Sequence, residues 1–344
     1  MNKITRIGLD IAKNVFALHA VNEHGKTVKR QTLSRAKVLP FFANLDPCLI
    51  GIESCASSQY WARELTRQGH TVKLMNPKFI IPHRKSGKND ANDAEAICEA
   101  VGRPNMRFVA VKSVEQQAVC GLHRSRQHLS HSRTALINHC RGLLAEFGVV
   151  LLQGAEKLRK ELPALLADES IGIPPILHAM MQEHLADLAR MDQRIHAIDQ
   201  QLKVWMSQHA EAERLEQIKG VGVITATAFV ASVVDAHLFK NSRQFAAWLG
   251  LVPKQYSSGG KSRLGGITKQ GDVYLRTLLV QGARGIVYQA GKREDRLSGW
   301  IKALVARAGV NKAVIAVAAK QARIIWAMLV HDAAFQPERI GVAA

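Results

Sequence analysis

The stretch "ITRIGLD", residues 4–10, decides how the N-terminal part of this chain is expected to fold. It is a short apolar run that ends in a carboxylate, Asp10. Two further runs follow it: "VFALHAV" (15–21), and "TVKRQT" (27–32), which alternates as an exposed strand does. The turn-forming segment "NEHGK" separates these two runs. Together the patterns predict three consecutive strands.

Beyond the third strand, helical and strand-like patterns alternate. They predict a helix over "SRAKVLPFFANL" (34–45), a buried strand over "CLIGIE" (48–53), a helix over "SQYWARELTRQG" (58–69), a strand over "TVKLM" (71–75) and a helix that starts near Asp90. This order is expected of an α/β domain with the ribonuclease H-like fold. In that fold the first three strands are antiparallel and the later ones parallel.

Carboxylates stand at the ends of these predicted elements. Asp10 and Glu53 follow apolar runs that should lie side by side, and "KNDANDA" (88–94) places Asp90 and Asp93 at a helix start. Acids there can simply cap the helix and oppose its dipole. Four converging carboxylates repel one another, however, and a hard divalent cation resolves that conflict. We therefore expect the four to hold Mg²⁺ or Mn²⁺, with Asp90 also serving as a cap.

Composition points to a polyanionic partner. The 344 residues include 47 Lys and Arg against 28 Asp and Glu, a net charge of +19, with 47% hydrophobic residues for folded cores. Such an imbalance is typical of nucleic-acid binding, although a ribosomal or membrane-surface role would also suit it.

Cysteine usage and apolar patterning indicate the compartment. The five cysteines form no C-x-x-C pair, so we expect free thiols, and zinc bound by Cys120 and His123 is improbable. The N-terminus does not read as a signal peptide, and the longest apolar stretch, near residues 303–320, is interrupted by charge. These features predict a soluble cytoplasmic protein, associated with the nucleoid when it acts, and no membrane.

Two long helices are predicted in the middle of the chain. Leucines recur every seven residues from Leu122 to Leu143, with eight basic or imidazole side chains between them, which favours a surface that follows phosphates. The candidates for phosphate contact are Arg124, Arg126 and Arg133. After the break "IGIPP" (171–175), a coiled-coil seam runs over residues 188–205. An intramolecular hairpin competes with a dimer contact for this seam, and we favour the dimer.

The C-terminal part contains two glycine-rich segments. "IKGVGVITATAFVASV" (218–233) looks like half of a helix-hairpin-helix, in which Lys219, Gly220 and Gly222 would hold a phosphate; a plain packing turn is the alternative. Residues 250–271 read as a flexible basic loop between helices, with phosphate-binding candidates Lys261, Arg263 and Lys269. The predicted domains are thus 1–110, 111–212 (dimerisation and nucleic-acid contact) and 213–335.

Four motifs in order, "GLDIAK" (8–13), "GIES" (51–54), "KNDANDA" and "GLVPKQYSSGGK" (250–261), resemble transposases of insertion-sequence family 110, and the insertion sequence 1111 subgroup among them. The resemblance covers nearly the whole chain. It implies a RuvC-like domain whose DEDD quartet matches Asp10, Glu53, Asp90 and Asp93. It also implies a C-terminal serine domain in which Ser258, directly before Gly259, matches the nucleophile; the neighbouring Ser257 could compete with it. Asn89 and Ala56 depart from the residues common in the family, but neither is a ligand.

The resemblance further implies a site-specific recombinase that is guided by a structured non-coding RNA and acts on donor and target double-stranded DNA. Members act as dimers that pair into a tetramer, with a serine of one protomer beside the quartet of another. A metal-dependent nuclease or junction resolvase without a covalent intermediate is the main alternative, and a non-enzymatic nucleic-acid-binding protein is another. An actin-like ATPase is disfavoured, because "DIAKNVF" (10–16) lacks the glycines of a phosphate loop.

Overall fold

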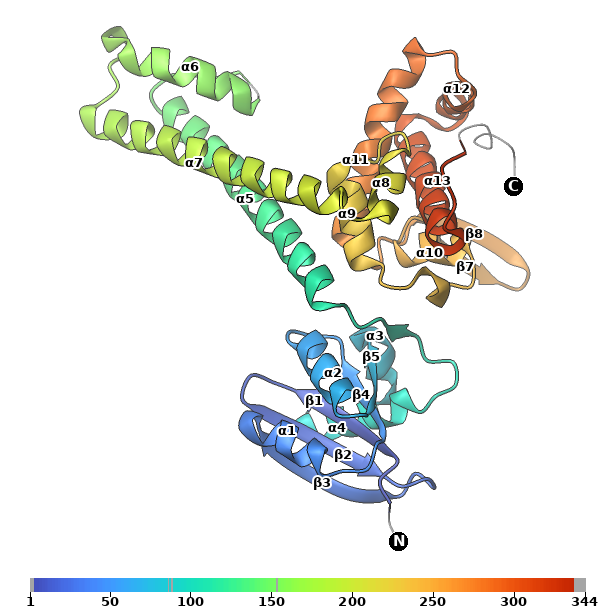
Figure 1. The fold of residues 1–344 in the computed structure, drawn as a ribbon. Helices are drawn as coiled ribbons and strands as arrows, with labels where there is room; N and C mark the ends of the chain where they lie inside the picture. The colour runs from blue at the N-terminus through green and yellow to red at the C-terminus, as the bar shows by residue number, and fades with distance from the viewer. Residues whose placement is uncertain (1–2, 86, 88, 153, 337–344) are drawn as a thin grey trace. The chain divides into compact units, whose positions relative to one another are not determined.

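The computed structural model describes residues 3–85, 87, 89–152 and 154–336 (Figure 1). The chain divides into two compact units, Met1–Ser113 and Val114–Ala344. The first unit is a mixed α/β domain, and the second is mostly helical.

A six-stranded sheet forms the centre of the first unit. Its strands are β1 (Arg6–Ile11), β2 (Val15–Val21), β3 (Thr27–Ser34), β4 (Leu49–Glu53), β5 (Thr71–Met75) and β6 (Phe108–Val109), in the order β3-β2-β1-β4-β5-β6. The first three strands pair antiparallel, and β1, β4 and β5 run parallel, as predicted. The sequence pattern missed β6, which has only two residues and pairs antiparallel with β5.

Helices cover both faces of this sheet (Figure 1). Helices α1 (Arg35–Ala43) and α2 (Ser58–Arg67) pack on one face, where Phe16, Trp61 and Ile50 belong to one apolar cluster. Helix α4 (Asp90–Val101) lies against β1, β2 and β4 on the other face. The short helix α3 (Pro77–Ile80) and the 3₁₀ turn Ile81–His83 lead into α4 and were not predicted.

In the second unit, two 32-residue helices, α5 (Val114–Ala145) and α7 (Pro175–Met206), form an antiparallel hairpin, and α6 (Ala155–Ala167) packs beside its far end (Figure 1). Leu188, Ile195 and Leu202 of the predicted seam are buried within this single chain. The preference for a dimer seam is therefore wrong for these residues. Their apolar side chains already have partners in the hairpin, which was the competing alternative.

The remaining helices form a separate core around Phe229, Phe245, Leu279 and Ile325. They are α8 (Ala210–Glu216), α9 (Val223–Ser232), α10 (Ser242–Trp248), α11 (Val273–Gln289), α12 (Arg296–Ala308) and α13 (Val310–His331), with an antiparallel pair of strands, β7 (Pro253–Ser258) and β8 (Lys261–Ile267), between α10 and α11.

Helix α13 is long and apolar enough to cross a membrane, which the sequence pattern had not indicated. It packs against α8, α10, α11 and α12, and its Ala318, Ala322 and Ile325 are fully buried. Helices at the centre of a helical core meet the same criteria of length and composition.

Candidate active site

The four predicted carboxylates come from three elements of the first unit. Asp10 lies near the end of β1, and Glu53 is the last residue of β4, the parallel neighbour of β1. Asp90 and Asp93 occupy the first turn of α4. Because α4 packs across β1, its N-terminal carboxylates come near the carboxyl end of that strand.

Gly8 explains how α4 approaches β1 so closely. A Cβ atom at Gly8 would lie 2.1 Å from the carbonyl oxygen of Ala94 and 2.3 Å from the nitrogen of Cys98, both of which belong to α4. Any side chain at position 8 would push the helix away from the strand. A glycine inside a strand often marks such a close backbone approach.

The cap of α4 is Asn89 and not Asp90. The Asn89 side-chain oxygen accepts a hydrogen bond from the backbone N–H of Asn92 at 2.8 Å. The expectation that Asp90 doubles as the cap is therefore wrong, because the preceding residue already satisfies the helix terminus. Lys88 of the same motif lies outside the described residues. With capping assigned to Asn89, the Asp90 carboxylate is not needed for this task.

The electrostatics of Asp10 indicate that the carboxylates lie near one another. Burial, as the largest cause, and the charges of Asp93, Asp90 and Glu53 together raise the pKa of Asp10 from 3.8 to about 6. A carboxyl group that gains a proton this easily sits in a negative field without full compensation.

Arg84 is a residue of this site that the sequence pattern did not single out. Its Nε lies 2.6 Å from Oδ1 of Asp93, and both side chains are largely buried. The two groups lack the alignment of a hydrogen bond, so Asp93 Oδ1 is a buried oxygen without a hydrogen-bond partner in the part of the chain that the structure describes. The basic stretch before α4 was the only signal of such a cation in the sequence.

An all-oxygen donor set of this kind suits Mg²⁺ or Mn²⁺ by its chemistry. Within the described residues, no group of three or more His, Cys, Asp or Glu side chains is arranged to hold a metal ion. Asp93 is held by Arg84 instead. The metal site thus stays a prediction that rests on the nature of the donors and on the repulsion acting on Asp10.

In the second unit, Ser258 ends β7 of a β-hairpin. The predicted flexible loop is this hairpin, so that expectation is wrong. Gly259 and Gly260 both have positive φ, 56° and 77°, and form a two-residue turn that brings Ser258 opposite Lys261. Turns of this type match the twist of paired strands and favour glycine at both positions. The sequence pattern did not predict these two strands, because they contain few β-branched residues.

The hairpin register separates the two serines. Ser258 pairs with Lys261 and Tyr256 with Arg263, which places these four side chains on one face. Ser257 pairs with Ser262 on the opposite face and accepts a hydrogen bond from the Gln255 amide at 2.9 Å.

The basic residues of the hairpin region are exposed. Lys254, Lys261, Arg263 and Lys269 have no ion-pair partner in the described part of the chain. Such unpaired cations are the groups that contact phosphates most readily.

The base of the hairpin is fixed by a buried cation. Arg276 of α11 is 8% exposed, and its Nη1 donates hydrogen bonds to the carbonyl oxygens of Leu249 and Gln270, both at 3.0 Å. These carbonyls flank the two strands, so Arg276 holds together the points where the hairpin leaves the helical core.

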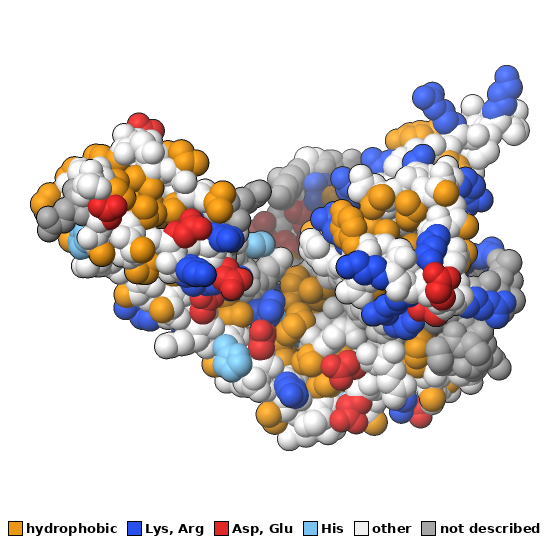
Figure 2. Space-filling view, turned by 90° about the horizontal axis from the view of Figure 1, so that it is seen from above, with side chains coloured by type: hydrophobic (Ala, Val, Ile, Leu, Met, Phe, Trp, Pro, Cys, Tyr) orange, Lys and Arg blue, Asp and Glu red, His pale blue; other side chains and the backbone are white. Residues whose placement is uncertain are grey.

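The three arginines of α5 that were predicted to contact phosphate differ in whether their side chains are already paired within the chain. Arg126 forms a double ion pair with Asp199, and Arg133 pairs with Asp192 at 2.7 Å, both on α7. Arg124 is exposed. Figure 2 shows acidic and basic side chains mixed over the helical hairpin of α5 and α7, whereas Lys and Arg prevail over the C-terminal helices. Two of the three predicted phosphate contacts on α5 are therefore engaged within the chain.

His123, which the pattern placed on the basic face, is buried instead. Its two ring nitrogens lie 3.0 Å from the Tyr274 hydroxyl and 3.1 Å from the Thr227 hydroxyl. Burial lowers the pKa of His123 to about 4 and raises that of Tyr274 to about 12. This neutral network joins three helices, and it leaves neither ring nitrogen available for zinc.

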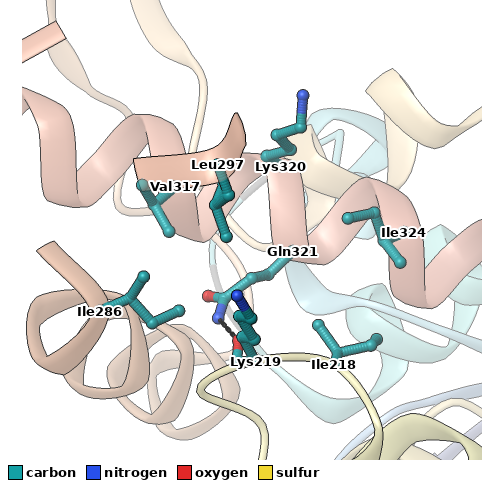
Figure 3. A pocket seen from close by; sticks show the side chains of 8 residues that line it. All are labelled: Ile218, Lys219, Ile286, Leu297, Val317, Lys320, Gln321 and Ile324. Atoms are coloured by element: carbon teal, nitrogen blue, oxygen red, sulfur yellow. Dashed lines mark hydrogen bonds between the residues drawn. The ribbon is translucent and has the colours of Figure 1, made fainter. Parts of the chain in front are cut away.

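The glycine turn before α9 combines packing with an open helix terminus. Lys219 forms an ion pair with Asp295 at 3.0 Å, and the Lys219 carbonyl accepts a hydrogen bond from the buried Gln321 amide beside a small apolar pocket (Figure 3). Gly222 caps α9 without a side-chain hydrogen bond, and open space surrounds it. Gly220 thus serves packing, whereas the Gly222 end keeps the free N–H groups that phosphate binding requires.

Gly220→Ala should destabilise the second unit much more than Gly222→Ala. Gly220 has φ +79°, and a Cβ there would lie 2.7 Å from Ile286 and 2.9 Å from the Gly282 carbonyl oxygen. We expect Gly220→Ala to lower the free energy of unfolding by roughly 2–3 kcal/mol and Gly222→Ala by under about 1 kcal/mol. Urea denaturation followed by circular dichroism measures both. Equal losses for the two variants would contradict the packing role of Gly220.

Two family models match the chain. One is described as a transposase, of the DEDD type named after IS110, and it matches residues 7–148. The other is described as the transposase IS116/IS110/IS902 family and matches residues 212–298. The first match includes all four carboxylates, and the second includes the serine hairpin.

Similar proteins cover almost the entire chain. A probable family 20 transposase of Pseudomonas aeruginosa is 46% identical over 335 residues, which span 97% of this chain and 99% of the relative. The transposase for insertion sequence element IS1111A of Coxiella burnetii is 41% identical, over 98% of this chain and 92% of its own length. The transposase for insertion sequence element IS1328 of Yersinia enterocolitica is 38% identical, over 97% and 99%.

Proposed function

Because the chain belongs to the IS116/IS110/IS902 family of transposases, we propose that it cleaves and rejoins DNA through Ser258, assisted by Mg²⁺ at the carboxylates of the first unit. Transposase activity on DNA follows from the family, and the serine and the metal are the proposal. The observation that carries the serine assignment is the hairpin, which presents Ser258 on the same face as Lys261 and Arg263.

The carboxylate cluster is the proposed metal site, on a first unit that we propose to be RuvC-like. The strand order β3-β2-β1-β4-β5 and the placement of Asp10 and Glu53 at adjacent strand ends support this. Asp10, Glu53, Asp90 and Asp93 would hold Mg²⁺ or Mn²⁺, whose charge would offset the mutual repulsion that, after burial, raises the pKa of Asp10. Bound there, the metal would supply Lewis-acid stabilisation of charge on a scissile phosphate.

The serine chemistry is a transesterification. The Ser258 oxygen attacks phosphorus, the bond from phosphorus to the departing deoxyribose oxygen breaks, and the serine proton leaves to a base while the departing oxygen gains one. The resulting phosphoserine diester has about the same bond energy as the DNA phosphodiester that was broken, so rejoining by the reverse transesterification needs no outside energy source. The Ser258 hydroxyl has no side-chain hydrogen bond among the described residues, so its activation would depend on a group that arrives with the DNA complex.

Lys261 and Arg263 are the proposed partners of the phosphate oxygens, because they share the Ser258 face and have no carboxylate partner among the described residues. Lys269, Arg124 and the α9 terminus at Gly222 are further proposed backbone contacts. All of these interactions would position the nucleic-acid backbone without recognising the base sequence.

Sequence choice is proposed to come from a structured guide RNA that pairs with donor and target DNA. In support, the chain carries a large positive charge and exposed unpaired cations suited to nucleic-acid backbones. Assembly as a homodimer that pairs into a tetramer and membership of the insertion sequence 1111 subgroup are also proposed. The 41% identity to the IS1111A transposase supports the subgroup.

The purified protein should carry one discrete RNA when it is expressed together with the flanking sequence of its element. The physical reason is that backbone contacts alone give little sequence choice, so a bound RNA must supply it. Extraction, sizing and sequencing of copurified nucleic acid measure this. A heterogeneous mixture of cellular RNA, together with site-specific recombination by the RNA-free protein, would contradict RNA guidance.

A further inference from the structure

The Ser258 face of the hairpin carries an aromatic side chain in an unusual setting. Tyr256 lies two residues before Ser258 on β7 and directly opposite Arg263 on β8. Its side chain is 64% exposed. A ring left in water on a hairpin without a core contributes little to folding and is free to contact a ligand.

We propose that Tyr256 stacks on an unpaired base of the DNA strand and thereby positions the phosphate that Ser258 attacks. This inference rests on the proposed function, because it takes the Ser258 face as the DNA-facing side. Two residues along a strand advance by about 7 Å, which is about two base steps at 3.4 Å each. The ring therefore reaches a nucleotide next to or one beyond the attacked phosphate.

The surroundings of Tyr256 favour nucleic acid over a protein partner. Lys261 and Arg263 lie on the same face, and neither has an ion-pair partner in the described residues. Aromatic rings interleaved with unpaired cations are the arrangement by which proteins hold single-stranded segments. A ring that docks on a protein surface would be expected to have apolar neighbours, and this face offers none beside it.

The opposite face of the same hairpin supplies a matched control. Leu264 is also 64% exposed, and it pairs with Gln255 on the face that carries Ser257. Truncation of Leu264 removes a comparable apolar side chain from the same strands, but on the side without the nucleophile. Any general loss of hairpin structure would affect both variants alike.

The test uses full-length protein carrying Ser258→Ala, so that binding is measured without chemistry. The probe is a short DNA duplex with a central mismatch bubble that contains a fluorescent base analogue. We expect Tyr256→Ala to weaken binding about tenfold and to abolish quenching of the analogue, since base stacking is worth that much. Tyr256→Phe keeps the ring and should retain both, and so should Leu264→Ala.

Two results would overturn the proposal. If Tyr256→Ala and Leu264→Ala bind and quench equally, the ring does not contact a base. If Tyr256→Phe binds the DNA as weakly as Tyr256→Ala, the contribution to binding comes from the hydroxyl and not from stacking of the ring. The binding and quenching measurements need no covalent adduct, so they stay valid if the Ser258 assignment fails. Normal quenching by a Tyr256→Ala protein that still forms a covalent adduct would refute the stacking role alone and leave the Ser258 assignment unaffected.

Discussion

Ser258→Ala is expected to abolish both the covalent protein–DNA adduct and recombination, with a loss of about a thousandfold or more, because it removes the attacking oxygen. Incubation of wild-type protein with Mg²⁺, guide RNA and DNA should yield an adduct that survives denaturation. The measurement is a gel-shift under denaturing conditions, followed by peptide mapping of the linked residue.

Ser257→Ala is the matched control for this prediction. Ser257 lies on the other face of the hairpin and accepts a hydrogen bond from Gln255, so its loss should leave at least part of the adduct. Ser258→Cys should keep at most weak activity, since a thiolate prefers softer partners than phosphorus. An adduct mapped to Ser257 would shift the nucleophile by one residue. Cleavage without any adduct would instead support a metal-dependent nuclease or resolvase.

Asp10→Asn and Glu53→Gln are expected to reduce strand cleavage by about 10²–10³-fold while DNA binding stays nearly unchanged. Under the proposed function, cleavage depends on charge at the carboxylate cluster, whereas binding depends on cations elsewhere in the chain. Cleavage assays in Mg²⁺ and binding assays on the same preparations separate the two effects. A variant that cleaves at the wild-type rate would remove that carboxylate from the site.

The same Asp10→Asn change should stabilise the metal-free protein at neutral pH. The pKa of Asp10 is raised to about 6 in the folded state, above its unfolded value, so its charge opposes folding above pH 6. As pH falls below 6, the folded state takes up a proton that the unfolded chain does not, so this opposition to folding fades and is lost below the unfolded pKa of 3.8. Since Asp10 is only partly buried, Asp10→Asn should raise the free energy of unfolding of the metal-free protein by about 1–2 kcal/mol at pH 7 to 8.

Thermal or urea denaturation in chelator, at pH 8 and again near pH 5, measures this gain. The difference between Asp10→Asn and wild type should shrink at the lower pH. Asp46→Asn provides the control, because Asp46 is an exposed carboxylate paired with Lys3 at the surface. A gap that grows as the pH falls would mean that Asp10 is not in a negative field.

The sequence predicted most of the first unit well because β1, β2, β4 and β5 are short apolar runs bounded by turn-forming residues, whereas β3 was predicted from its exposed alternation and the two-residue β6 was missed. The order of strands and the positions of Asp10 and Glu53 at their ends followed from that pattern. The approach of α4 did not, since Gly8 gives no signal of which helix packs on it. Arg84 was missed for a related reason, because its pairing with Asp93 depends on the path of a short irregular segment.

In the second unit, periodicity predicted two long helices but could not say what covers them. The seam that includes Ile195 meets α5 of the same chain, and a heptad pattern is identical for a hairpin and a dimer. Arg126 and Arg133 looked like phosphate contacts because their partners, Asp199 and Asp192, lie far away in sequence. The hairpin at residues 253–267 was hidden by its polar composition, although its Gly-Gly turn was visible.

The exposure of the β7–β8 hairpin on both faces has a consequence for fidelity. Two strands without a core have little folding free energy of their own, even with Arg276 anchoring their base. If Ser258 is the nucleophile, as proposed, its ordering would be thermodynamically coupled to the DNA that binds the hairpin. A poorly matched duplex would then meet the ordering cost with fewer contacts, so the proposed attack would be favoured mainly on well-matched substrates.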